Sequence, residues 1–472
     1  MNQATTKIWG RNISKMKCLK LNSRNSGRSD MNSWQQEYKG KTISAEGAAG
    51  FVKSGDLVVF TAGREAHAIG LALAARLGDL KNVKVVVPTP GYDFGWYDPG
   101  WEESFDVTIM MPTAICQQAI DERRCNYNFG TLVPFAFRET EQAADVLLTE
   151  LSPPDEKGFC SFGQSLWNKK RHIKNAKLVI AEVNKNLIRT YGDNFVHVSE
   201  IDYFVEHISS GGALGMGSLA GREKKEPEPY LKDIAGYVSQ LIKDRDTIQI
   251  GVGRTTEPLV MLGLLDGKHD LGWHSEATPP KVISLVREGV INGKYKTVNQ
   301  GKVVITSLGG GTGEEMEWVN NNPIFWLVDV AYLEDIRVIA SHDNMVAINN
   351  ALAIDLTGQI AAEGLGTRQI SVAGGQIPFV FGALLSKGGR SVIVLPSTAR
   401  TKDGIVSRIM PVLPQGTPVS MLRNCAQYVV TEYGIADLWG KTVRDRCEEF
   451  ISIAHPDFRA KLKREARKLY WP

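Results

Sequence analysis

The sequence predicts an α/β fold made of two related α/β domains. Short apolar runs typical of buried strands alternate with helix-like segments, which favours parallel sheets with helices packed outside. At 472 residues the chain is too long for one ordinary core, and it suggests two domains of roughly 200 residues each. Residues 52–64 also align without a gap on residues 242–254, with the strand and the Asp, Gly and Arg positions coinciding. We therefore expect two similar halves that face each other.

The composition excludes several classes of protein. The net charge of +3 is too small to argue for nucleic acid, and no apolar run approaches the roughly 18–20 residues of a membrane span. The six cysteines contain no CxxC pair and no tight spacing. We expect ordinary thiols in a reducing, cytoplasmic setting, with neither disulfides nor a metal site. An apolar fraction of 43% and 46 glycines fit a turn-rich α/β enzyme.

The beginning of the chain differs from the rest, because residues 1–30 hold seven Lys and Arg against the lone acid Asp30. We expect residues 1–33 to form a disordered basic tail. An organelle transit peptide, which is also basic and Ser-rich, is the alternative, and Met31 as the true start is another. The predicted domains are then 34–220 and 231–472, with the polar, charged segment 221–230 as the linker.

The N-terminal half opens with a helix-like segment from Trp34. The elements expected after it are a strand in 54–60, a helix through 68–75, and strands at 83–87, 107–111, 146–148 and 178–183. The stretch 150–163 is rich in proline and glycine and predicts a fixed loop beyond a strand end. We expect it to form a wall of a site or a contact between domains, with a purely structural loop as the alternative.

The C-terminal half opens with a buried strand in 246–253 that runs into the turn Gly251-Val252-Gly253. Residues 255–258 then supply the cap, the acidic first turn and the early proline of a helix. A helix N-terminus after a buried strand is a place where α/β proteins receive anionic ligands. Further strands are expected at 302–306, 338–340, 391–395 and 427–431.

Glu276 is the candidate around which the chain is organised. It follows the short apolar run 271–275 and precedes Pro279 and Pro280, which stop any helix there. Its carboxylate is therefore expected at a strand end or turn. His274 shares its face in extended backbone, but we expect His274 to be a packing residue.

Several motifs follow one another in the order found in a single family. They are Gly251-Val252-Gly253 with Pro258, and the segments 271–276, 348–359, 374–376, 395–399, 407–409, 430–436 and 453–459. With this ordered set the chain resembles the acetyl-CoA hydrolase/transferase family, including 4-hydroxybutyrate, butyryl and succinyl CoA-transferases. The resemblance covers about residues 34–462. It implies two CoA-transferase-like α/β domains with the site between them, and a homodimer.

The resemblance also implies a reaction. A carboxylate can attack a thioester, because thiolate is a good leaving group, and the family assigns that attack to the residue matching Glu276. Gly375 is then the backbone donor for the oxyanion, and Glu432 positions the acid substrate or the neighbours of Glu276. The substrates are an acyl-CoA and a carboxylic acid, with no permanently bound cofactor. The candidate CoA-binding residues are Gly251, Gly253, Gly374, Gly375, Gln376, Arg400 and Lys402.

Some positions depart from the family pattern. Pro280-Lys281 replaces a usual Asp-Gly, Pro378-Phe379 a common Asp-Phe, Phe381 a usual Arg, and Glu334 an Asn implicated in the family site. We expect an altered and more apolar acyl pocket. The leading hypothesis is a CoA-transferase. An acyl-CoA hydrolase that uses the same Glu276 is the chemical alternative, and a catalytically silent CoA-binding protein is the alternative of another class.

Overall fold

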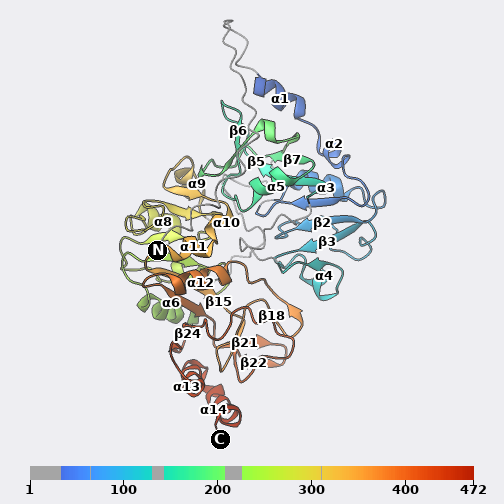
Figure 1. The fold of residues 1–472 in the computed structure, drawn as a ribbon. Helices are drawn as coiled ribbons and strands as arrows, with labels where there is room; N and C mark the ends of the chain where they lie inside the picture. The colour runs from blue at the N-terminus through green and yellow to red at the C-terminus, as the bar shows by residue number, and fades with distance from the viewer. Residues whose placement is uncertain (1–32, 64, 130–142, 208–225, 310, 472) are drawn as a thin grey trace, which may run out of the picture.

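The computed structural model describes residues 33–63, 65–129, 143–207, 226–309 and 311–471. The N-terminal half, blue to green in Figure 1, lies beside the C-terminal half, which is yellow to red and ends in two helices at the far end of the molecule. Residues 1–32 of the predicted tail and residues 221–225 of the predicted linker lie outside the described residues.

The N-terminal half forms a seven-stranded sheet in the order β10-β7-β5-β1-β2-β3-β4. Every neighbouring pair in it is parallel. The strands are β1 (Leu57–Phe60), β2 (Val83–Val87), β3 (Phe105–Ile109), β4 (Asn126–Tyr127), β5 (Val146–Leu151), β7 (Val179–Val183) and β10 (Tyr203–Glu206). All six residues of β5 are buried, as in a sheet covered on both faces.

The C-terminal half forms a nine-stranded sheet in the order β25-β24-β20-β15-β11-β12-β13-β14-β8. It is parallel except where the edge strand β25 runs against β24. The strands are β8 (Tyr191–Gly192), β11 (Thr247–Ile250), β12 (Gly272–His274), β13 (Val303–Ile305), β14 (Phe325–Leu327), β15 (Met345–Asn350), β20 (Arg390–Val394), β24 (Tyr428–Thr431) and β25 (Gly434–Asp437).

Helices and small sheets complete the described part of the chain. The helices are α1 (Ser33–Lys41), α2 (Ala45–Ala49), α3 (His67–Ala74), α4 (Gln117–Asp121), α5 (Lys169–Asn175), α6 (Tyr230–Gln240), α7 (Glu257–Met261), α8 (Val282–Arg287), α9 (Gly313–Val319), α10 (Val330–Leu333), α11 (Ile336–Ala340), α12 (Gln376–Leu385), α13 (Val443–Ile453), α14 (Pro456–Tyr470) and a 3₁₀ turn at Val198–Glu200. The short strands are β6 (Phe159–Ser161), β9 (Phe195–His197), β16 (Ala353–Asp355), β17 (Ile360–Ala361), β18 (Gly364–Leu365), β19 (Arg368–Gln369), β21 (Thr398–Thr401), β22 (Gly404–Ser407) and β23 (Ile409–Met410).

The two large sheets repeat one topology. Counted along the chain, β11, β12, β13, β14, β15, β20 and β24 occupy the same places as β1, β2, β3, β4, β5, β7 and β10. The strands of the repeated segments, β1 and β11, hold equivalent central positions. The prediction of two related α/β domains is therefore confirmed.

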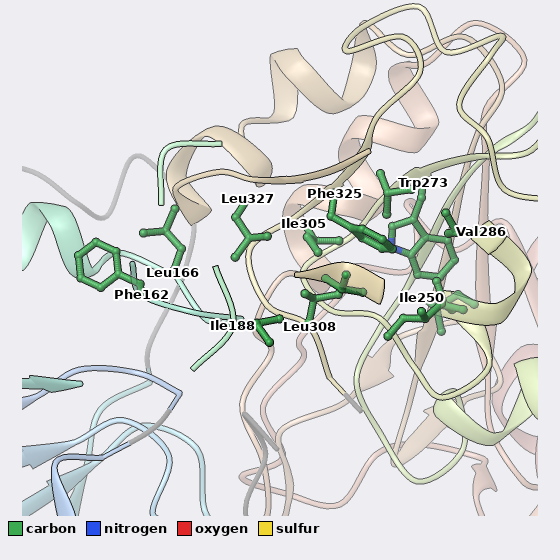
Figure 2. Close-up of a cluster of buried hydrophobic side chains, with 14 of the residues drawn as sticks. Phe162, Leu166, Ile188, Ile250, Trp273, Val286, Ile305, Leu308, Phe325 and Leu327 are labelled. Atoms are coloured by element: carbon green, nitrogen blue, oxygen red, sulfur yellow. The ribbon is translucent and has the colours of Figure 1, made fainter. Parts of the chain in front are cut away.

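The two halves are joined through strand β8. It belongs to the N-terminal half of the chain but pairs with β14 at the edge of the C-terminal sheet. The hydrophobic core is continuous across this junction, because Phe162, Leu166 and Ile188 extend the row of buried side chains formed by Leu327 and Ile305 (Figure 2). The relative placement of the halves thus rests on both backbone pairing and apolar packing.

Gly192 in β8 provides a test of this junction. Its φ is 107°, and a Cβ there would overlap the backbone of Leu327. We expect Gly192→Ala to destabilise the protein by at least about 2 kcal/mol, because strain and collision add. Gly55→Ala is the matched control, since Gly55 has a φ of 85° and nothing within 4 Å of the added atom. Thermal unfolding of both variants checks this, and equal losses would contradict it.

Most predicted elements are confirmed, but two local predictions are wrong. Residues 338–340 are not a strand and lie in α11, where the Asp335 side chain accepts a hydrogen bond from Arg337 N and caps the helix. A short apolar run is too short for its periodicity to distinguish a strand from a helix. Thr256 does not cap α7 through its side chain, because its hydroxyl donates to the Gly251 carbonyl oxygen.

Two properties suggested by the composition can be examined in the structure, namely the state of the cysteines and the hydropathy of the helices. Five cysteines within the described residues are free and buried. Across the described residues no helix combines the length and apolar character needed to cross a bilayer.

Candidate active site

Glu276 lies two residues beyond the end of β12, as predicted, and only 7% of its surface is exposed. Its backbone carbonyl oxygen accepts hydrogen bonds from Thr306 N at 3.1 Å and Ser307 N at 2.8 Å. Those residues follow β13, the next strand of the sheet. The backbone at Glu276 is therefore held independently of its side chain, and the carboxyl group is presented at the carboxyl edge of a parallel sheet.

The N-terminus of α12 approaches this carboxyl group. A Cβ on Gly375 would lie 2.8 Å from both Cδ and Oε1 of Glu276, so only glycine lets the backbone come this close. Gly374, with a φ of 54°, makes the turn into the helix. Within the described residues the Gly375 N–H has no recorded partner, whereas the next N–H, from Gln376, donates to Ala373.

Glu334 is a second carboxyl group at the same place. Glu334 caps the C-terminus of α10 and is 0% exposed. Its Oε1 lies 2.8 Å from the position that a Cβ on Gly375 would occupy. Burial, together with the charge and hydrogen bond of Glu276, raises the pKa of Glu334 well above its usual range. The only signal of this proximity in the sequence is the departure from Asn at position 334.

The glycine turn after β11 lies beside the end of β15. A Cβ on Gly251 would lie 2.6 Å from Asn349 Oδ1, and one on Gly253 would lie 2.9 Å from Asn350 Oδ1. Asn350 in turn accepts a hydrogen bond at its carbonyl oxygen from Gln376 Nε2 at 3.0 Å. The fold thus brings the predicted residues 251, 253 and 374–376 together with Glu276. The Gly253 N–H donates to Glu257 Oε1 at 3.2 Å.

His274 bonds to the backbone of Leu333, the residue before Glu334. It is fully buried, and its Nε2 donates to the Leu333 carbonyl oxygen at 2.8 Å. Burial lowers its pKa well below the usual value, so it is a neutral imidazole. Its ring packs against His342 with centroids 4.7 Å apart. This is the environment expected of a packing residue.

A segment of the N-terminal half passes next to the backbone that holds Glu276. Leu166 N donates to Thr306 O at 2.9 Å, and Leu308 N donates to Gln164 O at 2.7 Å. The segment follows the predicted loop 150–163, and its position supports the expectation of a contact between domains.

Unpartnered polar atoms gather around this junction. Within the described residues, buried side-chain atoms without a hydrogen-bond partner include Gln164 Oε1 and Nε2, Ser165 Oγ, Thr306 Oγ1, Glu334 Oε1 and Oε2, and Gln376 Oε1. Buried polar groups in folded proteins are nearly always satisfied. A polar ligand beside Glu276 would give these atoms partners.

Glu432 lies at the same sheet edge, directly after β24, but its recorded hydrogen-bond partner is Ser397 and not Glu276. Its Oε1 and Oε2 accept hydrogen bonds from Ser397 Oγ at 2.5 Å and Ser397 N at 2.9 Å. The charge of Glu432 also acts on Arg408, whose burial lowers its pKa. No recorded contact in the described part of the chain joins Glu432 to Glu276, so its role is not decided by contact.

Arg400 and Lys402 lie elsewhere. Both are exposed on the hairpin formed by β21 and β22. The structure records no contact between them and the residues around Glu276, and their assignment to CoA remains a prediction.

Phe381, which departs from the family pattern, and Phe379, which follows the departing Pro378, both pack into hydrophobic clusters. Phe379 is 0% exposed in a cluster with Leu333, Ile339 and Met345, and Phe381 packs against a second cluster. Only the first turn of α12 faces Glu276, because residues farther along a helix turn toward other neighbours. The expected apolar acyl pocket stays a prediction.

The described residues contain no group of His, Cys, Asp and Glu that could hold a metal ion. The geometry places the carboxyl group of Glu276 close to the backbone of Gly375 at a helix N-terminus.

Comparisons with known proteins agree with this geometry. Residues 24–210 match the model of the acetyl-CoA hydrolase/transferase N-terminal domain, and residues 311–466 match that of the C-terminal domain. The chain is 39% identical to the 4-hydroxybutyrate coenzyme A transferase of Clostridium kluyveri, over 93% of this chain and all of that protein. It is 34% identical to the succinyl-CoA:cyclohexane-1-carboxylate CoA transferase of Geobacter metallireducens, over 93% of this chain and 97% of that one.

Solved structures show the same fold. RipA from Yersinia pestis superposes with a TM-score of 0.84 at 30% identity, over 93% of this chain and all of that one. A 4-hydroxybutyrate CoA-transferase from Porphyromonas gingivalis superposes with a TM-score of 0.70 at 31% identity and the same coverage.

Proposed function

This chain belongs to the acetyl-CoA hydrolase/transferase family, and we propose that it transfers CoA from an acyl-CoA to a free carboxylic acid. The observation that carries the proposal is the carboxyl group of Glu276, held at the end of β12 against the backbone of Gly375. The relatives that cover most of the chain bear names of CoA-transferases, which supports the same activity.

The proposed cycle begins with attack by Glu276 on the thioester carbonyl. A carbon–oxygen bond forms, the carbon–sulfur bond breaks, and CoA leaves as a thiolate. The thiolate then attacks Cδ of Glu276, which forms a glutamyl-CoA thioester and releases the first acid as a carboxylate. A second carboxylate reverses both steps and regenerates Glu276.

Each tetrahedral step places negative charge on an oxygen next to Glu276 or on its own carboxyl group. The free N–H of Gly375 at the start of α12 is the donor that we assign to this oxygen. A preorganised donor of this kind commonly contributes about 3 kcal/mol to the transition state. CoA binding by residues 251, 253, 374–376, 400 and 402, and substrate positioning by Glu432, belong to the same proposal.

Hydrolysis is the competing activity, because water could intercept either covalent intermediate at the same residue. Initial rates of acyl-CoA consumption, measured with and without added carboxylates, separate the two. A transferase requires the acceptor acid, and the second acyl-CoA appears as the first disappears. A hydrolase consumes acyl-CoA at the same rate without any acceptor, and that result would replace the proposal. The homodimer and a cytoplasmic location stay predictions.

A further inference from the structure

Glu334 is a buried acid whose one recorded partner among the described residues is Glu276. Its side chain is fully enclosed, and both oxygens lack a hydrogen-bond donor within the described residues. A Cβ added to Gly375 would lie 2.8 Å from Glu334 Oε1 and also 2.8 Å from Glu276 Oε1. Two ionised carboxylates this close have no donor between them and repel each other, which is costly in a buried place.

A single proton removes the conflict. With a proton on Glu334, the contact recorded between the two side chains is a hydrogen bond from a carboxylic acid to a carboxylate, and such bonds are short and strong. Solvent exposure decides which of the two groups carries the proton. Glu276 has 7% of its surface exposed and Glu334 has none, so the negative charge is better solvated on Glu276. Glu276 then keeps the ionised form that nucleophilic attack requires.

Within the described residues, the other titratable groups nearby are not among the recorded causes of the raised pKa of Glu334. His274, which bonds to the neighbouring Leu333, has a pKa far below its usual value because it is buried. Burial likewise lowers the pKa of His342 to about 3 and that of Lys296 to about 7. Among the described residues, Glu276 is the one group whose charge acts on Glu334.

We propose that Glu334 works as a neutral carboxylic acid that shares one proton with Glu276 and donates a hydrogen bond to the nucleophile's carboxyl group. This inference deepens the proposed function and rests on it for its catalytic part. When the CoA thiolate attacks Cδ of Glu276, the developing oxyanion is on that same carboxyl group. Glu334 O–H then strengthens its bond to this oxygen without transferring the proton, so the reaction remains balanced as written above.

The proton state has a consequence for stability that is independent of turnover. The folded-state pKa of Glu334 is raised above its unfolded value, so folding takes up a proton between these two values. The contribution of Glu334 to the stability of the wild-type protein should therefore fall as pH rises from about 4.5. Glu334→Gln keeps a neutral donor of the same length and removes this loss.

The first measurement is the unfolding temperature of the ligand-free protein at a series of pH values. The variants are Glu334→Gln and, as a control, Glu288→Gln at an exposed position after α8. We expect the advantage of Glu334→Gln over the wild type to grow steadily with pH, and Glu288→Gln to follow the wild type. A difference that stays constant with pH would overturn the shared proton, whether or not the protein transfers CoA.

The second measurement is the rate of CoA transfer. Glu334→Gln should retain activity within about tenfold of the wild type, while Glu334→Ala, which lacks a donor, should lose about 100-fold in kcat. Equal activity of the Gln and Ala variants, both shown to be folded by their unfolding temperatures, would overturn the donor role. Absence of transfer in the wild type with every acyl-CoA and acceptor would instead defeat the proposed function and leave the pH result to decide the proton pair.

Discussion

Glu276→Ala is expected to abolish CoA transfer, with a loss of at least about four orders of magnitude in kcat. No other carboxylate in the described part of the chain is both adjacent to the Gly375 backbone and partly exposed, because Glu334 is fully enclosed. The fold should survive, since Thr306 and Ser307 bond to the backbone oxygen of Glu276 and not to its side chain. Initial rates with short, branched and aromatic acyl-CoAs measure the loss.

The covalent intermediate gives a direct readout of the same prediction. Incubation with an acyl-CoA followed by borohydride should reduce a glutamyl-CoA thioester to an alcohol, and the intact protein should become lighter by one oxygen less two hydrogens. Peptide mapping should place this change at Glu276, and Glu276→Ala should show none. Glu288→Gln serves as the control and should be modified as the wild type is. Transfer that persists in Glu276→Ala would refute the assignment.

Gly375→Ala is expected to lower kcat/KM by at least about 100-fold while the protein remains folded. The φ of Gly375 is −75°, which alanine adopts without strain. The added Cβ would instead lie 2.8 Å from Cδ of Glu276 and from Oε1 of Glu334, so the two carboxyl groups must move away from the helix N-terminus. Displacements of about 1 Å at a reacting group cost about two orders of magnitude in rate.

The matched control for this prediction is Gly313→Ala. Gly313 also stands at the start of a helix, is exposed, and has nothing within 4 Å of an added Cβ. Its activity and unfolding temperature should equal those of the wild type. If Gly375→Ala is as active as Gly313→Ala, the close approach of α12 to Glu276 has no part in catalysis.

Much of the architecture could be predicted from local patterns. The buried strand at 83–87 is confirmed at the predicted bounds, and the strand predicted in 54–60 is present as β1. The ungapped match of 52–64 with 242–254 indicated two domains with the same topology. Pro279 and Pro280 placed Glu276 at a strand end without any knowledge of the sheet. These features depend on periodicity, proline and glycine, which act within a few residues of sequence.

The content of the site was decided by tertiary structure. Glu334 meets Glu276 only because α10 ends beside the carboxyl end of β12, and Gln164 reaches the same junction only because β8 carries the N-terminal half to the edge of the second sheet. Residues 338–340 became helix because Asp335 caps them, although their composition suited a strand. Proximity between distant segments follows from strand order and packing across the whole chain. The sequence therefore determined the two related α/β domains and placed Glu276 at a strand end, and the fold alone decided which residues surround it.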